Sequence, residues 1–223
     1  MYLLIKRFFD ILLSSICLLL LSPLLLPIML GLKLTGEGYI WYFQERVGLK
    51  NSKFNIYKFA TMLKNSPNME GGVITTKKDP RITPMGDFLR KSKINELPQL
   101  LNIFLGHMSF VGPRPVMPIS FAAYPKEVQE EIYNVKPGLT GVGSIVFRDE
   151  EELITKVRDN GGDTWDFYQN EIYPFKGQLE QWYLKNQSFG LDFKIIIATA
   201  LVVLFPSLDV VSLFFKQHPK RNF

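Results

Sequence analysis

A run of apolar residues near the N-terminus constrains this chain more than any other feature. No charged residue occurs between Asp10 and Lys33, and residues 11–32 read ILLSSICLLLLSPLLLPIMLGL. About 20 apolar residues are enough to cross a bilayer as a helix. Ser22-Pro23 interrupts the run midway, and proline removes a backbone donor and clashes with the preceding turn. We therefore predict a bend near Ser22, whose hydroxyl can satisfy a carbonyl freed by the proline.

Three interpretations of this run compete. A cleaved signal peptide is disfavoured, because no small-x-small cleavage site precedes the charged region. A single spanning helix is the simplest interpretation. However, Lys6 and Arg7 precede the run and favour a cytoplasmic N-terminus, so a full span would place the remaining basic chain outside the cell. A re-entrant helix-break-helix hairpin, bent at Ser22 and Pro23, keeps both ends on the cytoplasmic side, and we favour it.

A second apolar stretch covers residues 195–208 and is interrupted by Pro206. It is too short to be read as a membrane span. Either a core helix or an interfacial helix lying on the bilayer fits its composition, and the sequence leaves both open.

Composition places the rest of the chain in one folded domain. The 223 residues are 47% hydrophobic and 21% charged, which argues against disorder. Lys and Arg crowd residues 50–114 within a net charge of +5. Cys17 is the sole cysteine, so no intrachain disulfide can form. With two distant histidines, His107 and His218, the composition disfavours a Cys/His zinc site.

The pattern of turns and periodic segments predicts an α+β fold that is mostly helical. We expect a membrane hairpin over residues 1–34, packed on a small α/β globular part over residues 35–223 that carries interfacial helices. Short strands are predicted at 39–43 and 54–59, and helices at 87–91, 95–106, 125–134 and 164–186, the last with a bend at Pro174.

Residues 79–115 carry the features of a phosphate site. Positive charge gathers there, from Arg81, Arg90, Lys91, Lys93 and Arg114. Arginine offers a fixed fork of donors that matches phosphate oxygens. Arg114 stands between two prolines, so it loses little entropy when it binds an anion. Asn95-Glu96 opens the predicted helix, and helix N-termini stabilise anions.

Each of these features also has a simpler interpretation. Asn is a favoured helix N-cap and Glu is favourable in a first turn, so Asn95-Glu96 also fits ordinary capping. A cluster of Lys and Arg beside a membrane segment commonly binds lipid headgroups. No nucleic-acid-binding module is recognised, and the basic residues lie beside a lipid segment, which disfavours a nucleic-acid partner. The residues by themselves indicate an anion-binding site at a membrane edge.

Short motifs follow one another along nearly the whole chain. They are Lys6-Arg7-x-x-Asp10, Ser22-Pro23, Phe43-Gln44-Glu45-Arg46-Val47-Gly48, Tyr57-Lys58-Phe59, Asp79-x-Arg81, Leu89-Arg90-Lys91, Glu96-Leu97-Pro98-Gln99-Leu100-Leu101-Asn102, Val111-Gly112-Pro113-Arg114-Pro115, Lys136-Pro137-Gly138 and Leu191-Asp192. In this order they resemble the bacterial sugar transferases, specifically the monotopic phosphoglycosyl transferases that initiate surface-glycan and glycoprotein-glycan assembly. So many ordered matches exclude chance similarity.

The resemblance implies an enzyme that takes a UDP-sugar and undecaprenyl phosphate, releases UMP and leaves an undecaprenyl diphosphosugar. It implies a monotopic protein of the bacterial inner membrane whose catalytic part faces the cytoplasm. An Asp-Glu dyad would work with Mg²⁺, and Arg90 and Arg114 would hold phosphate oxygens. Lys58, Arg81 and Arg148 are further candidate phosphate contacts. Membrane lipid is the expected surrounding partner, and a homodimer or contacts with downstream glycosyltransferases stay open.

Asn95 departs from the family at the position where the nucleophilic Asp of the dyad is expected, while Glu96 is retained. A neutral amide is a poor nucleophile and a weaker Mg²⁺ ligand than a carboxylate. Three explanations stay open: a deliberate replacement of Asp, a natural variant in which Glu96 or the lipid phosphate attacks, or lost transfer with retained binding. Asn95 and Glu96 are therefore the candidate catalytic and metal residues. A non-catalytic protein that binds polyprenyl phosphate or partner transferases is the alternative.

Overall fold

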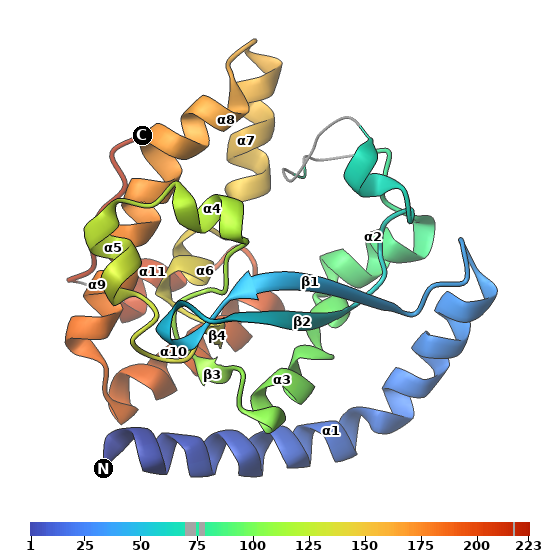
Figure 1. The fold of residues 1–223 in the computed structure, drawn as a ribbon, viewed down its shortest axis with the longest axis horizontal. Coiled ribbons are helices and arrows are strands. Elements are labelled where there is room, and N and C mark those ends of the chain that lie inside the picture. The colour runs from blue at the N-terminus through green and yellow to red at the C-terminus, as the bar shows by residue number, and fades with distance from the viewer. Residues whose placement is uncertain (70–74, 76–78, 216) are drawn as a thin grey trace.

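Helix α1 (Tyr2–Leu34) runs along one side of the molecule and turns in its second half (Figure 1). The computed structural model describes residues 1–69, 75, 79–215 and 217–223. Within these residues, α1 is the one helix that is long and apolar enough to cross a bilayer. Many of its large apolar side chains are exposed, Leu4 and Leu19 among them at 77% and 75%. An exposed apolar surface of this kind is typical of contact with lipid.

The bend predicted near Ser22 has a local cause in the structure. A proline at position 23 cannot donate to the carbonyl four residues earlier, which is that of Leu19. The Ser22 hydroxyl donates to the Leu19 oxygen at 2.8 Å and so replaces the missing bond. The helix continues through Pro23 and Pro27, so the chain turns within one helix and not at a non-helical break between two.

Both halves of α1 are fixed to the same globular part. In the first half, the Arg7 guanidinium donates to the backbone oxygens of Ile103 and Phe104 at 2.6 and 2.7 Å. Asp10 is buried and accepts hydrogen bonds of 3.0 Å from Ser109 Oγ and Phe110 N. The helix therefore does not leave the globular part after its first turns.

The second half of α1 packs on a different part of the same body. Ile28 and Leu32 are buried against Phe59 and Leu89, which lie in the globular part. A helix that crossed the bilayer completely would carry one end away from that body. Both ends of α1 therefore pack on one globular part, and a re-entrant path through the membrane stays a prediction.

Two small sheets form the β part. Strands β1 (Trp41–Val47) and β2 (Lys53–Phe59) form an antiparallel hairpin, joined by the 3₁₀ turn η1 (Leu49–Asn51). Strands β3 (Ser109–Val111) and β4 (Gly138–Thr140) form a parallel pair that the sequence did not predict. The two strands approach closely at glycines, since a Cβ on Gly138 would lie 2.2 Å from the Gly112 nitrogen.

Short helices surround these sheets, as Figure 1 shows. They are η2 (Ser66–Asn68), α2 (Pro84–Lys91), η3 (Ile94–Glu96), α3 (Gln99–Leu105), α4 (Pro118–Ala122), α5 (Lys126–Glu131), α6 (Val142–Val146), α7 (Glu150–Asp159), α8 (Thr164–Phe167), η4 (Tyr168–Ile172), α9 (Tyr173–Asn186), α10 (Phe189–Leu204) and α11 (Val210–Phe214). The α+β, mostly helical class predicted from the sequence is confirmed, while the division at residue 34 stays a prediction.

Helix α10 is a core helix along one face, which is one of the two interpretations that its apolar sequence left open. Ile195 and Ala198 on one face are fully buried in the main core. Phe193 and Leu204 on the other face are 64% and 69% exposed. One face of the helix therefore belongs to the core and the other is apolar and exposed, while contact of that face with a bilayer stays a prediction.

Several predicted elements differ from the structure in their bounds, and the strand expected at 39–43, for example, is β1 at Trp41–Val47. The helix expected from residue 95 begins at Gln99 and ends, as predicted, at Gly106, which has a φ of 90°. The helix expected over 164–186 contains a π-helical turn, η4, immediately before Pro174. That turn stands where a bend was predicted, because proline cannot continue the regular hydrogen-bond pattern.

Candidate active site

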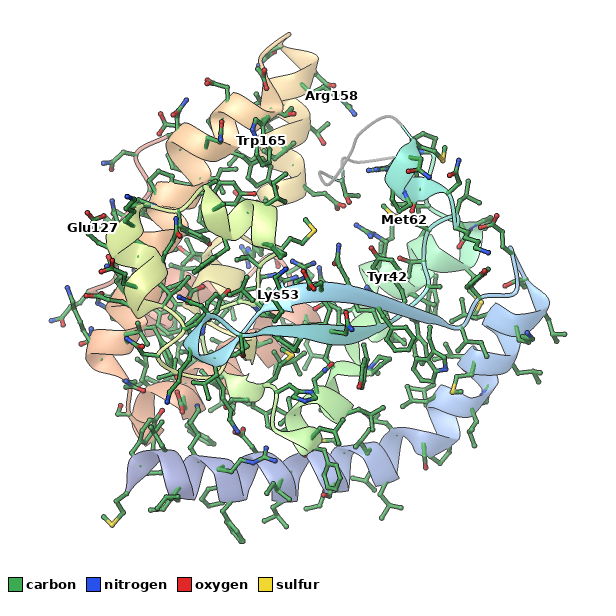
Figure 2. All side chains as sticks on the ribbon, in the orientation of Figure 1. Tyr42, Lys53, Met62, Glu127, Arg158 and Trp165 are labelled. Atoms are coloured by element: carbon green, nitrogen blue, oxygen red, sulfur yellow. The ribbon has the colours of Figure 1, made fainter. Side chains whose placement is uncertain are left out.

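A cleft of about 1910 Å³ lies between the β1–β2 hairpin and the surrounding helices. Figure 2 labels Tyr42 and Met62, two of the side chains that line it. Its other lining residues come from segments far apart in the chain, including η3, the loop after β3, α6, α7 and α9. All of the predicted catalytic, metal and phosphate residues border this cleft, namely Asn95, Glu96, Arg90, Arg114, Arg81, Arg148 and Lys58.

Glu96 is the point at which the cations of the cleft meet. Its Oε1 accepts from Lys58 Nζ at 2.9 Å and from Arg114 Nη2 at 3.3 Å. The Glu96 side chain is 18% exposed. The turn η3 carries it into this position after Lys93, whose φ of 59° reverses the chain direction at the end of α2. Glu96 thus joins β2 to the Arg114 loop.

The charges around Glu96 shift its titration and that of its neighbours. Burial alone would raise the pKa of Glu96, but Lys58 and Arg114 outweigh it and hold that pKa far below its ordinary value. Burial lowers the pKa of Lys58 to about 8. Repulsion from Arg114 and Arg46 also lowers this pKa, whereas attraction to Glu96 raises it. Glu96 is consequently ionised, and Lys58 is charged mainly below pH 8.

Arg46 is a site residue that the sequence analysis did not single out. Its Nη1 donates to the Pro115 oxygen at 3.2 Å, and its Nε is buried without a hydrogen-bond partner in the described part of the chain. Burial, and then repulsion from Arg114, lowers its pKa to about 10. The alternation of β1 could have revealed it, because Tyr42, Gln44 and Arg46 share one face of the strand.

These residues leave the cleft with an excess of positive charge around one carboxylate. Arg46, Lys58 and Arg114 are three cations that interact with the single negative charge of Glu96. Like charges held together in a poorly solvated place repel one another unless an anion joins them. The arrangement therefore favours the binding of a ligand with more than one negative charge.

Asn95 does not act as a helix cap. The residue is buried, and its Oδ1 has no hydrogen-bond partner among the residues described. It lies inside the turn η3, and helix α3 begins after Pro98 with no side-chain cap. The capping interpretation of Asn95 is therefore wrong. An unpaired buried acceptor that borders the cleft instead indicates a ligand-binding role.

Arg90 and Arg148 lie at the edge of the cleft. Arg90 Nη2 is 3.5 Å from Glu151 Oε1, so this pair links α2 to α7. Arg148 Nη1 donates to the Leu208 oxygen at 3.0 Å, in the link between α10 and α11. Both side chains already have a protein partner, and their roles as phosphate ligands stay predictions.

Arg81 has a different environment from the other arginines. Its side chain is 2% exposed, and Nε and Nη2 donate to the two carboxylate oxygens of Asp79 at 2.9 and 2.6 Å. This bidentate pair holds the loop before α2. A role for Arg81 in phosphate binding stays a prediction, and it would require competition with Asp79.

The opposite wall of the cleft comes from α7 and α9. Glu150 Oε1 accepts from Lys176 Nζ and from Tyr168 OH, each at 2.7 Å. One turn after Lys176, Glu180 is 4% exposed and accepts from the Arg114 backbone nitrogen at 3.4 Å. The sequence analysis did not single out either acidic residue, because nothing in the local pattern marks Glu150 of α7 or Glu180 of α9 as a cleft residue.

The site has a limited set of oxygen atoms for a divalent cation. Among the described residues, no group of three or more His, Cys, Asp and Glu is arranged to hold a metal ion. The unpaired Asn95 Oδ1 and the adjacent Glu96 carboxylate are oxygen ligands of the kind that Mg²⁺ prefers. Mg²⁺ usually takes one or two protein oxygens and completes its shell with water and substrate phosphates. Asn95 and Glu96 fit that mode.

A comparison with known protein families identifies the chain. The family described as bacterial sugar transferase matches residues 1–206. The chain belongs to the bacterial sugar transferase family. This result confirms the resemblance recognised from the motifs, and the match covers α1 together with every residue of the cleft.

Several curated proteins are similar to this chain in sequence. An undecaprenyl-phosphate glucose phosphotransferase of Komagataeibacter xylinus is 36% identical over 87% of this chain and 35% of its own length. An undecaprenyl-phosphate galactose phosphotransferase of Salmonella typhimurium is 33% identical over 90% of this chain and 40% of its length. The exopolysaccharide production protein ExoY of Sinorhizobium fredii is 39% identical over 68% and 73%, respectively. The chain spans less than half the length of the first two.

Proposed function

We propose that this chain transfers a phosphosugar from a UDP-sugar to undecaprenyl phosphate and releases UMP. In this reaction the bond between the donor's β-phosphorus and the bridging oxygen breaks, and UMP leaves with that oxygen. An oxygen of the lipid phosphate ends on the β-phosphorus, which gives an undecaprenyl diphosphosugar. The names of the relatives support both substrates, since they describe undecaprenyl-phosphate glucose, galactose and N-acetylgalactosamine phosphotransferases.

One observation carries the proposal: the cations Lys58 and Arg114 contact Glu96 in a cleft whose lining also includes Arg46. A donor diphosphate brings two or more negative charges, which would relieve the repulsion among Arg46, Lys58 and Arg114. As negative charge moves to the departing UMP, the same fixed cations would stabilise it without reorganisation. Mg²⁺ bound by Asn95 Oδ1 and Glu96 would add charge stabilisation at the diphosphate.

The membrane part of the proposal rests on α1. A helix whose two halves both pack on the globular part suits a monotopic, re-entrant anchor with that part at the inner face of the cytoplasmic membrane. The apolar face of α10 would lie on the same surface. This placement gives the cleft access to a nucleotide sugar from the cytoplasm and to a lipid phosphate from the bilayer.

Asn95 sets the expected rate. Since its neutral amide is a poor nucleophile, we propose that the chain with Asn95 binds the donor normally and transfers slowly, through Glu96 or through direct attack by the lipid phosphate. The alternative is a protein that binds polyprenyl phosphate without chemistry. Retention of the complete cation cluster around Glu96 favours the transferase.

The test is the release of UMP from a panel of UDP-sugars by the purified full chain in nanodiscs. Mg²⁺ and undecaprenyl phosphate are present, and product is followed as radiolabelled sugar in the lipid phase. Labelled lipid that forms together with UMP supports the proposal. UMP formed without labelled lipid would indicate hydrolysis, and donor binding without any UMP would favour the binding-only alternative.

A further inference from the structure

Glu180 is a buried carboxyl group that the reaction described above does not use. It is 4% exposed and borders the cleft from α9. Its Oε1 accepts one long hydrogen bond, 3.4 Å, from the Arg114 nitrogen, and its Oε2 is buried without a hydrogen-bond partner in the described residues. A buried acceptor left unpaired costs about 1–3 kcal/mol. A group of this kind in a cleft is explained if a ligand supplies the donor.

The backbone beside Glu180 packs closely against this carboxyl group. Gly143 at the start of α6 faces it, and a Cβ there would lie 2.6 Å from Oε1. A Cβ on Gly141 would lie 4.0 Å from Oε2. Any side chain at position 143 would therefore collide with the carboxyl group or displace it. The nearest cation on α9, Lys176, bonds to Glu150 instead.

Arg114 fixes the distance between Glu180 and the cation cluster. Its backbone nitrogen contacts Glu180, while its guanidinium contacts Glu96 at 3.3 Å and Ser144 Oγ at 3.5 Å. The Arg114 oxygen also accepts from Tyr133 OH at 2.8 Å, which holds its backbone in place. Glu180 thus stands one arginine side chain away from the place where a phosphate would bind.

The chemistry of Glu180 fits a sugar hydroxyl and not a second phosphate group. A carboxyl group repels phosphate, whereas it accepts readily from a hydroxyl group, as acidic residues do with ribose in dinucleotide sites. With the phosphate held by the guanidinium of Arg114, the ring of the attached sugar would extend toward Glu180. We propose that Glu180 is a specificity-determining residue of the donor subsite, and that its Oε2 accepts a hydrogen bond from a hydroxyl of the transferred hexose.

The inference rests on the proposed function, because it names the part of the UDP-sugar donor that Glu180 would bind. The experiment measures binding and not turnover, since Asn95 is expected to slow the chemistry. Isothermal titration of the full chain in nanodiscs is carried out with UDP-glucose, UDP-galactose, UDP-N-acetylgalactosamine and UDP. Glu180→Gln keeps the shape of the side chain, and Glu171→Gln, an exposed acidic residue outside the cleft lining, is the matched control.

At pH 8, where the Glu180 carboxyl group is ionised, we expect Glu180→Gln to weaken binding of the preferred UDP-sugar about 10- to 100-fold, which is the loss for one hydrogen bond to a charged acceptor. UDP affinity should stay within about twofold, and Glu171→Gln should change neither. A deoxy analogue of the preferred UDP-sugar lacks the hydroxyl group that Glu180 would bind. Its affinity for the native chain should be reduced by the same factor as the affinity of the Glu180→Gln variant for the full UDP-sugar. The Glu180→Gln variant should bind the deoxy analogue and the full UDP-sugar with the same affinity, because the hydrogen bond is already absent.

If Glu180→Gln weakens the binding of UDP and of the UDP-sugar equally, the inference is overturned, because Glu180 would then contact the ribose or a phosphate and not the hexose. Full affinity of the variant for every ligand would also overturn it and leave the transferase proposal intact. If no UDP-sugar binds the native chain, both proposals fail. Deoxy analogues that all bind the native chain as tightly as the preferred UDP-sugar would also overturn the inference, and this measurement needs only native protein.

Discussion

The guanidinium of Arg114 lies 3.3 Å from Glu96 Oε1, while the backbone nitrogen of the same residue lies 3.4 Å from Glu180 Oε1. Pro113 and Pro115 restrict the backbone on both sides of Arg114. One rigid residue therefore joins the η3 wall of the cleft to the α9 wall. It holds the cation that would meet the donor phosphate at a fixed distance from the carboxyl group that would meet the sugar.

Arg114→Ala should lower UMP release by about 100-fold or more, because it removes the forked donor aimed at the diphosphate. Arg114→Lys should recover only part of the rate, since a single ammonium cannot form the same paired bonds. Membrane association, measured by vesicle flotation, should not change. Equal loss of turnover and flotation would instead assign Arg114 to lipid headgroups.

Asp10→Ala should destabilise the folded chain by about 2 kcal/mol. The substitution leaves the buried donors Ser109 Oγ and Phe110 N without their acceptor. Asp10→Asn keeps an acceptor oxygen in place, so it should lower the free energy of unfolding clearly less than Asp10→Ala does. Thermal unfolding of the two variants in detergent measures the difference. Indistinguishable midpoints for all three proteins would show that this contact does not anchor α1.

Replacing Ser22-Pro23 by Ala-Ala should straighten α1, because the Leu19 carbonyl regains its helical donor. Leu3→Cys and Lys220→Cys are each introduced alone into a Cys17→Ser background. Labelling with a membrane-impermeant maleimide then shows on which side of the membrane each position lies. In the parent both should label from the cytoplasmic side only. The Ala-Ala variant should shift labelling of one position to the outer side. Labelling of the parent from opposite sides would exclude the re-entrant anchor.

The Glu180 carboxyl group predicts a pH-dependent stability. Burial raises its pKa from 4.5 to about 7, although the hydrogen bond from the Arg114 nitrogen and the charge of Lys176 act to lower it. Between these values the folded chain keeps a proton that the unfolded chain has lost. This contribution to stability is therefore complete below pH 4.5 and is lost as pH rises to about 7. The full change amounts to about 3 kcal/mol.

Glu180→Gln does not titrate, so it provides the reference for this prediction. Its unfolding midpoint relative to that of the native chain should rise between pH 5 and pH 8. Glu171→Gln should follow the native chain throughout. A difference between native and Glu180→Gln proteins that does not change with pH would show that Glu180 is ionised in the folded state over this whole range.

The features that the sequence predicted well are those with local causes. Ser22 bonds to Leu19 because both lie within one helical turn of Pro23, and Gly106 ends α3 because it can adopt positive φ. Arg81 had a local partner as well, and the spacing of Asp79 and Arg81 could have indicated their bidentate pair.

The features that it missed depend on contacts between distant segments. Asn95 has the propensity of an N-cap, but the left-handed turn at Lys93 places it in a separate 3₁₀ turn. The parallel pairing of β3 with β4, and the meeting of Arg46 and Glu180 at Arg114, join segments that are separated by many residues. No periodic pattern in those segments encodes such contacts.

The most direct test of the central claim compares UMP release by the chain with Asn95 and by its Asn95→Asp variant. Both are assayed in the same nanodiscs with Mg²⁺, undecaprenyl phosphate and the UDP-sugar panel. The account predicts that the Asp form releases UMP at least about 100-fold faster, with unchanged donor affinity, because a carboxylate replaces a neutral amide beside Glu96. Equal rates would contradict the role assigned to position 95. No UMP from either protein, with every sugar tested, would contradict the assignment of this cleft as a phosphosugar transferase site.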